Sequence, residues 1–572
     1  MTVASTQIHA PASRETPTPA GRGRWFALAI LALGLSMIVL DGTIVGVALP
    51  RVIDALHLNL TDAQWVNSLY AMIFAALLLT MGRLGDRFGR RGLFLIGVVI
   101  FVAGSLTAGM ATSAGSLIGS RALQGLGGAM ILPATLSTVN AIFRGRDRAI
   151  AFGVWGSVMA GMAAIGPLLG GWLTTTFDWP WIFYVNLPLG VVVLVGTLLW
   201  VPETKAGIVT KGLDVDGLLT SGIGMAAIVF GLIEGTRLGW WKPTSDFTAL
   251  GFTWPASAPI SIVPVALAVG LVFVGLFILW ERHRARVQRD AILDLTLFAL
   301  PTFTWGNLTA MTVAIAEFAL VFVLPLHLVN ALGLSIMGAG WVLAAMAAGA
   351  FLSGAAARKL AERFDATRVV LIGLGLELVG ALVTAFVVGR DASGKAIALA
   401  LVIYGVGLGL ASAQLTSTVL ADVPTDRSGS ASATQSTVRQ VGSAIGTALA
   451  GSTLAVGLSH FLPARLAEIT GLPAKVAASL ASSTSSSAGG TIPQLQAQGT
   501  HGQLGALGPQ VADALAAGFA DATRWSVLVA AAFLALGLLG AIQVRRGAKQ
   551  IGSSAAHLDP DQEVLAANHP NG

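Results

Sequence analysis

A few ionisable side chains lie inside long apolar stretches of this sequence, and these are the residues that could do chemistry. Asp41 lies in a stretch that runs from Trp25 to Leu49, and Arg121 lies at the start of a later one. A charge in such surroundings is costly unless it is paired or hydrated, so each one is a candidate functional residue. A carboxyl group in a low-dielectric medium can exchange a proton, and a guanidinium stays charged. We interpret Asp41 as a proton-exchanging acid and Arg121 as its counter-charge; the alternatives are a carboxylate paired at the membrane edge and a helix-packing anchor.

Three further charged residues lie in apolar stretches of the second half of the chain. Glu317 and Glu377 could each carry a second proton or balance a cationic substrate, and Arg439 could balance one of the two acids. The alternative for each acid is a buried carboxyl group with satisfied hydrogen bonds. We predict a role in proton coupling for Glu317 and a secondary role for Glu377 and Arg439.

A compact charged motif follows the second apolar stretch, between Gly82 and Arg91. Asp86 in this motif can accept hydrogen bonds from a helix N-terminus and from arginines such as Arg87 and Arg90. Such a clasp predicts a cytoplasmic gate that includes Gly82. The alternative is that these arginines only set the orientation of the chain in a membrane.

Small residues and a proline lie together late in the fifth apolar stretch, at Gly166, Pro167, Gly170 and Gly171. Proline removes a backbone donor and kinks a helix, while glycines let two helices approach closely. The pattern indicates a moving interface between helices; the alternative is close packing alone.

The whole composition explains why these residues lie in apolar surroundings. The chain has 572 residues, of which 55% are hydrophobic and 11% are charged, and its mean hydropathy is +0.77. Soluble domains carry about 25% charged residues, so a lipid bilayer must surround most of this chain. Fourteen stretches are long and apolar enough to span it, approximately 25–49, 63–82, 93–112, 115–141, 150–174, 181–201, 215–235, 259–280, 303–328, 335–357, 369–389, 395–421, 430–457 and 524–544.

The basic residues orient these stretches. Most of the 34 Lys and Arg residues fall in segments on one side when the stretches are threaded alternately. Basic segments stay in the cytoplasm, so the distribution predicts a multi-pass protein of the plasma (cytoplasmic) membrane with both termini cytoplasmic. Residues 1–23 are rich in Pro, Ser and Thr and are expected to form a disordered cytoplasmic tail.

An internal repeat divides the chain. The motif from Leu84 to Phe88 recurs at Leu360 to Phe364, and the glycines near Gly166 recur near Gly446, at offsets of 276 and 280. Repeats of the same sense predict two similar bundles around a central cavity. We expect an N-terminal six-helix bundle, two linker helices, a C-terminal six-helix bundle with a long mobile external loop, and a cytoplasmic tail, at 24–203, 204–300, 301–545 (loop 459–523) and 546–572.

Several classes of protein are disfavoured. The chain has no cysteine, and its eight histidines show no metal-ligand spacing, so we expect no metal site, thiol chemistry or cofactor. The basic residues lie in short loops, which does not favour nucleic-acid binding. No nucleophile–base set appears, so an enzyme is not expected.

These motifs resemble the major facilitator superfamily. Gly82 to Arg91 resembles its signature loop, Arg121 to Ala129 its proton-coupling motif, and Gly166 to Gly171 the antiporter motif of its drug exporters. Leu40 to Pro50 and Trp181 to Gly190 are similar to the fourteen-span drug:proton antiporters of the QacA/EmrB type.

The resemblance implies an all-α major facilitator fold, with two six-helix bundles and two inserted helices. It also implies alternating access driven by a proton gradient, with Asp41 and Arg121 in coupling and Asp86 in the gate. Gly46 stands where the family usually has Asn, and Pro180 replaces the usual Arg between two tryptophans. The second copy of the gate motif is degenerate, with Glu362 and Asp365.

The leading hypothesis is a monomeric secondary transporter that exports small lipophilic molecules, including cationic ones, in exchange for protons. Export of an endogenous metabolite or of a lipid is the alternative within the same class. A membrane sensor without transport is the alternative from another class, and a fused soluble domain would favour it.

Overall fold

The computed structural model describes residues 23–143, 145–204, 214–249, 252–287, 289, 292–424, 428–553 and 555. The predicted disordered tail therefore lies outside the described residues, apart from Gly23, and the predicted C-terminal tail lies outside them from residue 556 onward.

Nearly every described element is a helix, and one short antiparallel hairpin is the exception. The long helices are α1 (Gly23–Leu56), α2 (Leu60–Phe88), α3 (Arg90–Gly109), α4 (Ala114–Ile142), α5 (Gly145–Thr176), α7 (Asn186–Trp200), α8 (Val215–Leu238), α9 (Ile262–Arg286), α10 (Pro301–Leu326), α11 (Ile336–Phe364), α12 (Ala366–Val387), α13 (Gly394–Leu420), α14 (Ser428–Ala467) and α17 (Gly508–Gln550). The short elements are α6 (Trp181–Tyr184), α15 (Ala474–Ser486), α16 (Thr491–Gln498), strands β1 (Phe247–Ala249) and β2 (Phe252–Trp254), 3₁₀ turns and the π-helical turn η2 (His327–Ala331).

The predicted membrane spans are present as helices. Thirteen helical segments in the described part of the chain are long and apolar enough to cross a membrane, with α6 and α7 forming one of them. The predicted fifth span, 150–174, lies in the 32-residue helix α5. The arrangement is therefore consistent with fourteen spans. Polar caps set the starts of several helices, as where the side chains of Asn59 and Asp62 cap each other's backbone at α2.

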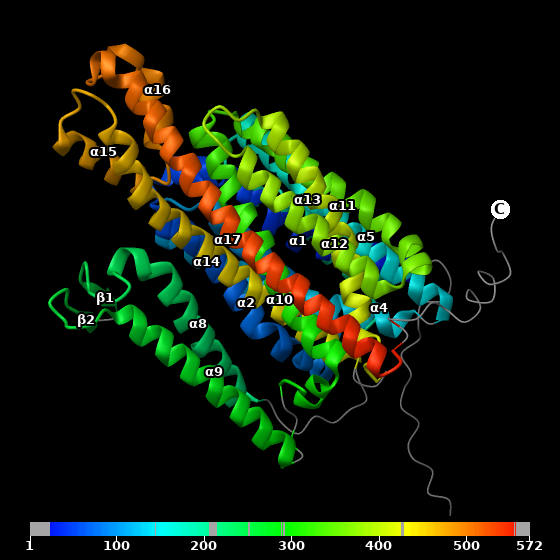
Figure 1. The fold of residues 1–572 in the computed structure, drawn as a ribbon. Coiled ribbons are helices and arrows are strands. Elements are labelled where there is room, and N and C mark those ends of the chain that lie inside the picture. Colours follow the sequence, from blue (N-terminus) through cyan, green and yellow to red (C-terminus); the bar gives the residue numbers. More distant parts are fainter. Residues whose placement is uncertain are drawn as a thin grey trace, which may run out of the picture.

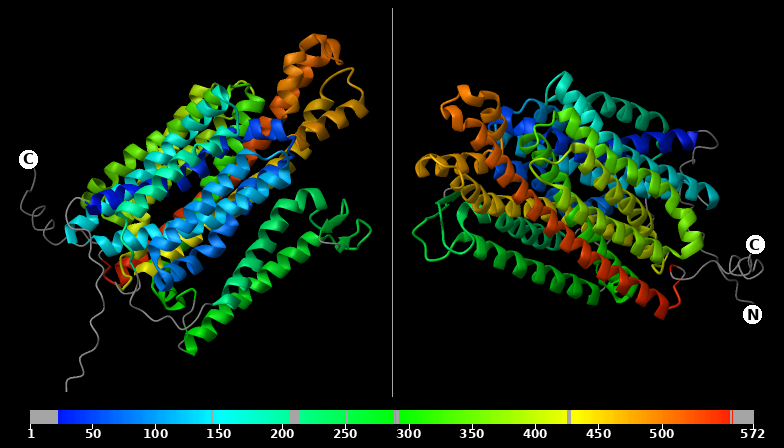
Figure 2. Two further views of the ribbon diagram at one scale, coloured as in Figure 1. Left: turned by 180° about the vertical axis from the view of Figure 1, so that it is seen from behind. Right: turned by 45° about the horizontal axis from the view of Figure 1, so that its top comes forward.

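Most of the helices run side by side in one elongated bundle (Figure 1). We call one end of the bundle the loop end, because it carries α15, α16 and the β1–β2 hairpin, and the other the tail end, where α1 begins and α17 ends. The pair α8 and α9 lies along one side of the bundle, and the three views in Figures 1 and 2 agree on this placement.

The internal repeat is visible in how the helices pack. A Cβ on Gly127 of α4 would lie 2.6 Å from the backbone nitrogen of Phe101 on α3. At the matching positions of the second half, a Cβ on Gly407 of α13 would clash with the backbone nitrogen of Glu377 on α12. The same small residue thus permits the same close crossing twice, and this supports the division into halves at 24–203 and 301–545 that we propose.

Several contacts between the two halves lie toward the loop end. Gln64 Nε2 of α2 donates a hydrogen bond of 2.8 Å to the carbonyl oxygen of Ala448 on α14. On the other side, a Cβ on Gly340 of α11 would lie 2.7 Å from the carbonyl oxygen of Pro167 on α5. In the centre, Gly46 of α1 packs against Val321 of α10.

The inserted pair α8–α9 packs on the seam between the halves through α8. Trp65 Nε1 of α2 donates to Glu234 Oε1 of α8 at 3.0 Å, and Ser452 Oγ of α14 donates to the carbonyl oxygen of Leu232. Helix α9 packs on α8 and is otherwise largely exposed, as expected for a lipid-facing helix.

The segment 459–523 corrects one prediction. It was expected to be a long mobile loop, but it is mainly helical: α14 and α17 extend into it, and α15 and α16 lie between them. Arg465 and Asp521 join the two extensions through an ion pair of 2.7 Å. Ala and polar residues gave little apolar signal there, but the small side chains allow close packing, as at Gly518 against Leu462.

Candidate functional site

Asp41 and Arg121 meet inside the N-terminal half. Asp41 lies near the middle of α1, and Arg121 lies two turns into α4. The side chains form an ion pair between Arg121 Nη1 and Asp41 Oδ2, and both are almost completely buried. A buried pair of this kind is costly to break, because either partner alone would be an uncompensated charge.

Neutral polar side chains complete this pair. Gln124 Nε2 donates to Asp41 Oδ1 at 2.9 Å and to Ser105 Oγ of α3 at 2.8 Å, while its Oε1 accepts from Arg121 Nη1 at 2.8 Å. Asn186 Nδ2 of α7 also donates to Ser105 Oγ, at 3.2 Å. The network thus joins four helices of the N-terminal half.

Helix α2 holds the guanidinium from the remaining side. Arg121 Nε donates to the carbonyl oxygen of Val66 at 3.3 Å, and its guanidinium carbon lies 4.2 Å from the centre of the Tyr70 ring. Such a cation–π contact stabilises a desolvated cation. The network therefore gives both charged side chains polar partners inside the bundle.

Glu317 and Arg439 form a second ion pair, in the C-terminal half. Glu317 Oε2 of α10 lies 3.0 Å from Arg439 Nη2 of α14. The side chains are 18% and 42% exposed, so this pair is more accessible than the pair formed by Asp41 and Arg121. Of the two acids that Arg439 could balance, the structure therefore pairs it with Glu317.

Glu377 is fully buried on α12 and interacts electrostatically with both members of this pair. Neither of its carboxyl oxygens, nor the hydroxyl of the buried Tyr404 on α13, has a hydrogen-bond partner among the described residues. The described residues therefore supply no hydrogen bond to this acid.

The predicted gate motif lies at the tail end, where α2 turns into α3. The side chain of Asp86 lies outside the described residues. Arg87 stacks on Phe88, with 5.2 Å from its guanidinium carbon to the ring centre. Arg90 Nη1 donates to the carbonyl oxygen of Ser137 on α4 at 3.1 Å, and a Cβ on Gly82 would lie 3.4 Å from Pro133, also on α4. These contacts stay within the N-terminal half.

The motif of Gly166, Pro167, Gly170 and Gly171 lies where α5 crosses two other helices. A Cβ on Gly170 would lie 2.8 Å from Ile44 Cγ1 on α1, close to Asp41 in the chain, and Gly166 packs against Thr43 in the same way. A Cβ on Gly171 would lie 3.1 Å from Met337 Cα on α11 of the other half. The motif therefore packs α5 closely on both α1 and α11.

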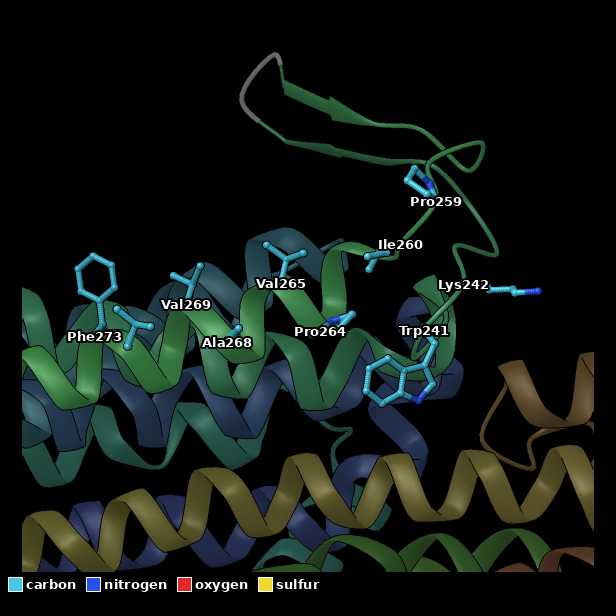
Figure 3. A pocket seen from close by; sticks show the side chains of 10 residues that line it. Trp241, Lys242, Pro259, Ile260, Pro264, Val265, Ala268, Val269 and Phe273 are labelled. Carbon is cyan, nitrogen blue, oxygen red and sulfur yellow. The ribbon is translucent and has the colours of Figure 1, made fainter.

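An apolar groove of about 680 Å³ lies on the outer side of α9, remote from these ionisable groups. Val265, Val269 and Phe273 line it along the helix, and Trp241 and Lys242 lie at its end (Figure 3). No acidic residue lines the groove, so it takes no part in the ionisable network. Among the described residues, no group of three His, Asp or Glu side chains could hold a metal ion.

Sequence reasoning missed Gln124, Ser105, Asn186 and Tyr70 as site residues. Each is a polar side chain in an apolar helix, and that was the signal that could have found them. Gln124 meets Arg121 three residues away on the same helix. The other contacts of these four residues with the network join different helices, so spacing along the chain could not show them.

Comparison with known proteins identifies the family. Residues 31–447 match the sequence model of the Major Facilitator Superfamily. The chain belongs to the Major Facilitator Superfamily. The predictions of this family, of its all-helical membrane fold and of a secondary transporter rather than an enzyme are confirmed.

The relatives of this major facilitator protein have names from drug export. It is 32% identical to the multidrug efflux pump LfrA of Mycolicibacterium smegmatis, over 83% of this chain and 90% of the relative. It is 30% identical to the tetracenomycin C resistance and export protein of Streptomyces glaucescens, over 81% and 82% of the two chains. The names agree with the predicted membership of the drug:proton antiporter group and with export of small molecules.

Solved structures support the fold of this major facilitator protein. A bacterial homologue of the human lysosomal transporter Spinster, in an inward-facing and unoccupied conformation, aligns with a TM-score of 0.60 and 19% identity, over 92% of this chain and 99% of that one. An autoinhibited peptide transporter of the POT family aligns with a TM-score of 0.58 and 14% identity, over 92% and 97%.

Proposed function

We propose that this transporter exports small lipophilic molecules across the cytoplasmic membrane in exchange for protons. The observation that carries the proposal is the buried ion pair between Asp41 and Arg121, held by neutral donors in a four-helix network. When an ion-paired carboxylate inside a membrane bundle takes up a proton, the local charge changes by one unit, and this change is costly in apolar surroundings.

The coupling follows from linkage. A proton can drive the cycle only if its affinity differs between the inward-facing and outward-facing states. Protonation of Asp41 removes its attraction for Arg121. Gln124, which bonds both side chains, would then change its hydrogen-bond partners. Because α5 packs on α1 next to Asp41 and also on α11, a shift of α1 reaches the interface between the halves.

The contacts between the halves support alternating access. They lie toward the loop end, at Gln64 with Ala448 and at Gly340 with Pro167. With the tail end placed in the cytoplasm, as the basic residues favour, this conformation is closed to the outside. We propose a functional monomer with Asp86, Gly82, Arg87 and Arg90 at the cytoplasmic gate.

The second pair suggests how charge on the substrate is accommodated. Glu317 is partly exposed and its partner Arg439 more so. A cationic substrate can replace Arg439 as the partner of Glu317, and a neutral substrate leaves the pair intact. Glu377 and Tyr404, buried nearby, would respond to this change of charge.

Export of a self-made metabolite is the second candidate for the substrate. One relative, 31% identical over 77% of this chain, is named a probable actinorhodin transporter of Streptomyces coelicolor. Both candidates are lipophilic organic molecules, and the same pump mechanism serves either.

Transport by purified protein tests the proposal. In proteoliposomes that carry a pH gradient, we expect accumulation of a lipophilic cationic dye to follow the gradient and to stop when an ionophore collapses it. Accumulation that is unchanged without the gradient would overturn the antiport mechanism. Competition by actinorhodin against the dye would support export of a self-made metabolite, and its absence would favour the first candidate.

A further inference from the structure

A cluster of charged and polar groups lies at the tail end of the inserted pair, far along the chain from Asp41. Asp214 precedes α8 and caps it, accepting a hydrogen bond of 2.9 Å from the backbone nitrogen of Gly217. Trp280 Nε1 of α9 donates to the same carboxyl oxygen at 2.8 Å, and Arg284 Nε lies 3.1 Å from the other oxygen. Asp214 thus fastens the start of α8 to the end of α9.

Glu281 of α9 places a second carboxyl group against the first. Its Oε1 and Asp214 Oδ2 lie 2.7 Å and 2.8 Å from the single point that a Cβ on Gly217 would occupy. The two oxygens therefore lie close together beside Gly217, and the two carboxyl groups interact electrostatically. A hydrogen bond between two carboxyl groups requires that one of them carries a proton, because two carboxylates are both acceptors.

Both carboxyl groups are buried, and one of their oxygens lacks a hydrogen-bond donor in the described part of the chain. Glu281 is fully buried and Asp214 is 4% exposed. Glu281 Oε1 has no hydrogen-bond donor among the described residues, although its Oε2 accepts from the backbone nitrogen of Leu293 at 3.0 Å. A buried carboxyl oxygen aimed at another carboxyl group points to a bound proton as the missing partner.

Among the described residues, two arginines from different helices surround the pair. Arg284 belongs to α9 itself, and Arg83 of α2 interacts electrostatically with Glu281. Arg83 lies next to Gly82 in the motif that we propose as the gate. The pair therefore links the inserted helices to the part of α2 at which the tail end would open.

We propose that Asp214 and Glu281 form a proton-binding site that holds the tail ends of α8 and α9 together. With one shared proton, the two carboxyl groups hydrogen-bond to each other and the pair is closed. Loss of that proton leaves two adjacent carboxylates, which repel one another, and the end of α9 moves away from the start of α8. The pair is a pH-dependent latch, separate from the coupling site at Asp41.

Distance measurements on a labelled protein test the latch. The natural sequence has no cysteine, so Leu219→Cys on α8 and Leu279→Cys on α9, both exposed apolar positions, introduce one spin-label pair. We expect the inter-label distance to lengthen between about pH 5 and pH 9. Exposed carboxyl groups lose their protons near pH 4, but burial and a second carboxyl group nearby move this loss to higher pH. In Glu281→Gln, whose amide can donate to Asp214 at every pH, the lengthening should be lost.

A matched control lies two residues from the pair. Asp216 is exposed in the first turn of α8, and Asp216→Asn removes a charge from the same helix end without touching the pair, so its distance should still change with pH. A pH-independent distance in the parent, or an unchanged pH response in Glu281→Gln, would overturn the latch. The readout needs no substrate, so failure here leaves the antiport mechanism untouched.

Discussion

Asp41 on α1 and Glu317 on α10 occupy matching positions of the two halves, separated by the 276 residues of the repeat, yet they pair with arginines on helices that do not match. Asp41 pairs with Arg121 on α4, whereas Glu317 pairs with Arg439 on α14, the counterpart of α5. The first ion pair is buried, and the second is partly exposed. Each half thus has an acid at the same position of its first helix, but the two acids lie in different environments.

Removal of the charge at Asp41 should uncouple transport. Asp41→Asn leaves Arg121 buried without its partner, and we expect a loss of about 3–5 kcal/mol in the free energy of unfolding. The double variant Asp41→Asn with Arg121→Gln should regain most of that stability but no proton-driven efflux. Thermal unfolding and gradient-driven dye transport measure the two effects.

The exposed acid Asp54, whose side chain is 61% exposed near the end of the same helix, provides the control. Asp54→Asn should leave both stability and transport close to those of the parent, since surface ion pairs contribute little. Gradient-driven efflux at the parental rate in Asp41→Asn would contradict the role of Asp41.

Neutralisation of Glu317 should separate substrates by charge. Glu317→Gln removes the acid that a cation would meet, and we expect at least about tenfold slower efflux of a cationic dye, equivalent to about 1.4 kcal/mol. Efflux of a neutral compound of similar size should change much less. Glu468→Gln, at a side chain that is 70% exposed, is the matched control; equal losses for both substrates would argue against charge recognition at Glu317.

A methyl group on Gly170 should disturb the crossing of α5 and α1. The added Cβ would lie 2.8 Å from Ile44 Cγ1 and 2.9 Å from the carbonyl oxygen of Ile44, so the helices must separate. We expect Gly170→Ala to lower thermal stability and to slow transport several-fold. Gly275→Ala on α9, where a Cβ meets nothing within 4 Å, should have neither effect, and the same loss in both variants would contradict a specific crossing.

A cross-link at the loop end should arrest the cycle. The Gln64 side chain overlaps the place of a Cβ on Gly451, so cysteines at both positions can approach one another across the two halves. Oxidation of Gln64→Cys with Gly451→Cys should stop efflux, and reduction should restore it. The two single variants control for the substitutions themselves; continued transport in the fully cross-linked protein would show that this contact does not open.

Most of the fold could be predicted from the sequence, because a bilayer requires long runs of apolar residues. Runs of about 20 apolar residues mark the spans, and the offset between Leu84 and Leu360 marked the repeat. Sequence reasoning allowed only a short amphipathic helix between 459 and 523, because helix packing there depends on small residues such as Gly518 that carry no apolar signal.

The site was predictable only in its charged members. Asp41 and Arg121 stand out because a charge in a span is rare. Ser105 and Asn186 are neutral and reach the network from α3 and α7, so only the fold shows that they belong to it. Glu281 lies at the end of a span beside several basic residues, where a charge attracts no notice until its burial is known.

The length of α17 has a practical consequence. Its 43 residues measure roughly 64 Å at 1.5 Å per residue, about twice the hydrocarbon thickness of a bilayer. Together with α14, α15 and α16 it forms a helical protrusion to which antibody fragments could bind. Fragments raised against it would label intact cells if the protrusion faces the medium, and would supply a fixed landmark for imaging particles whose remaining mass is hidden in detergent.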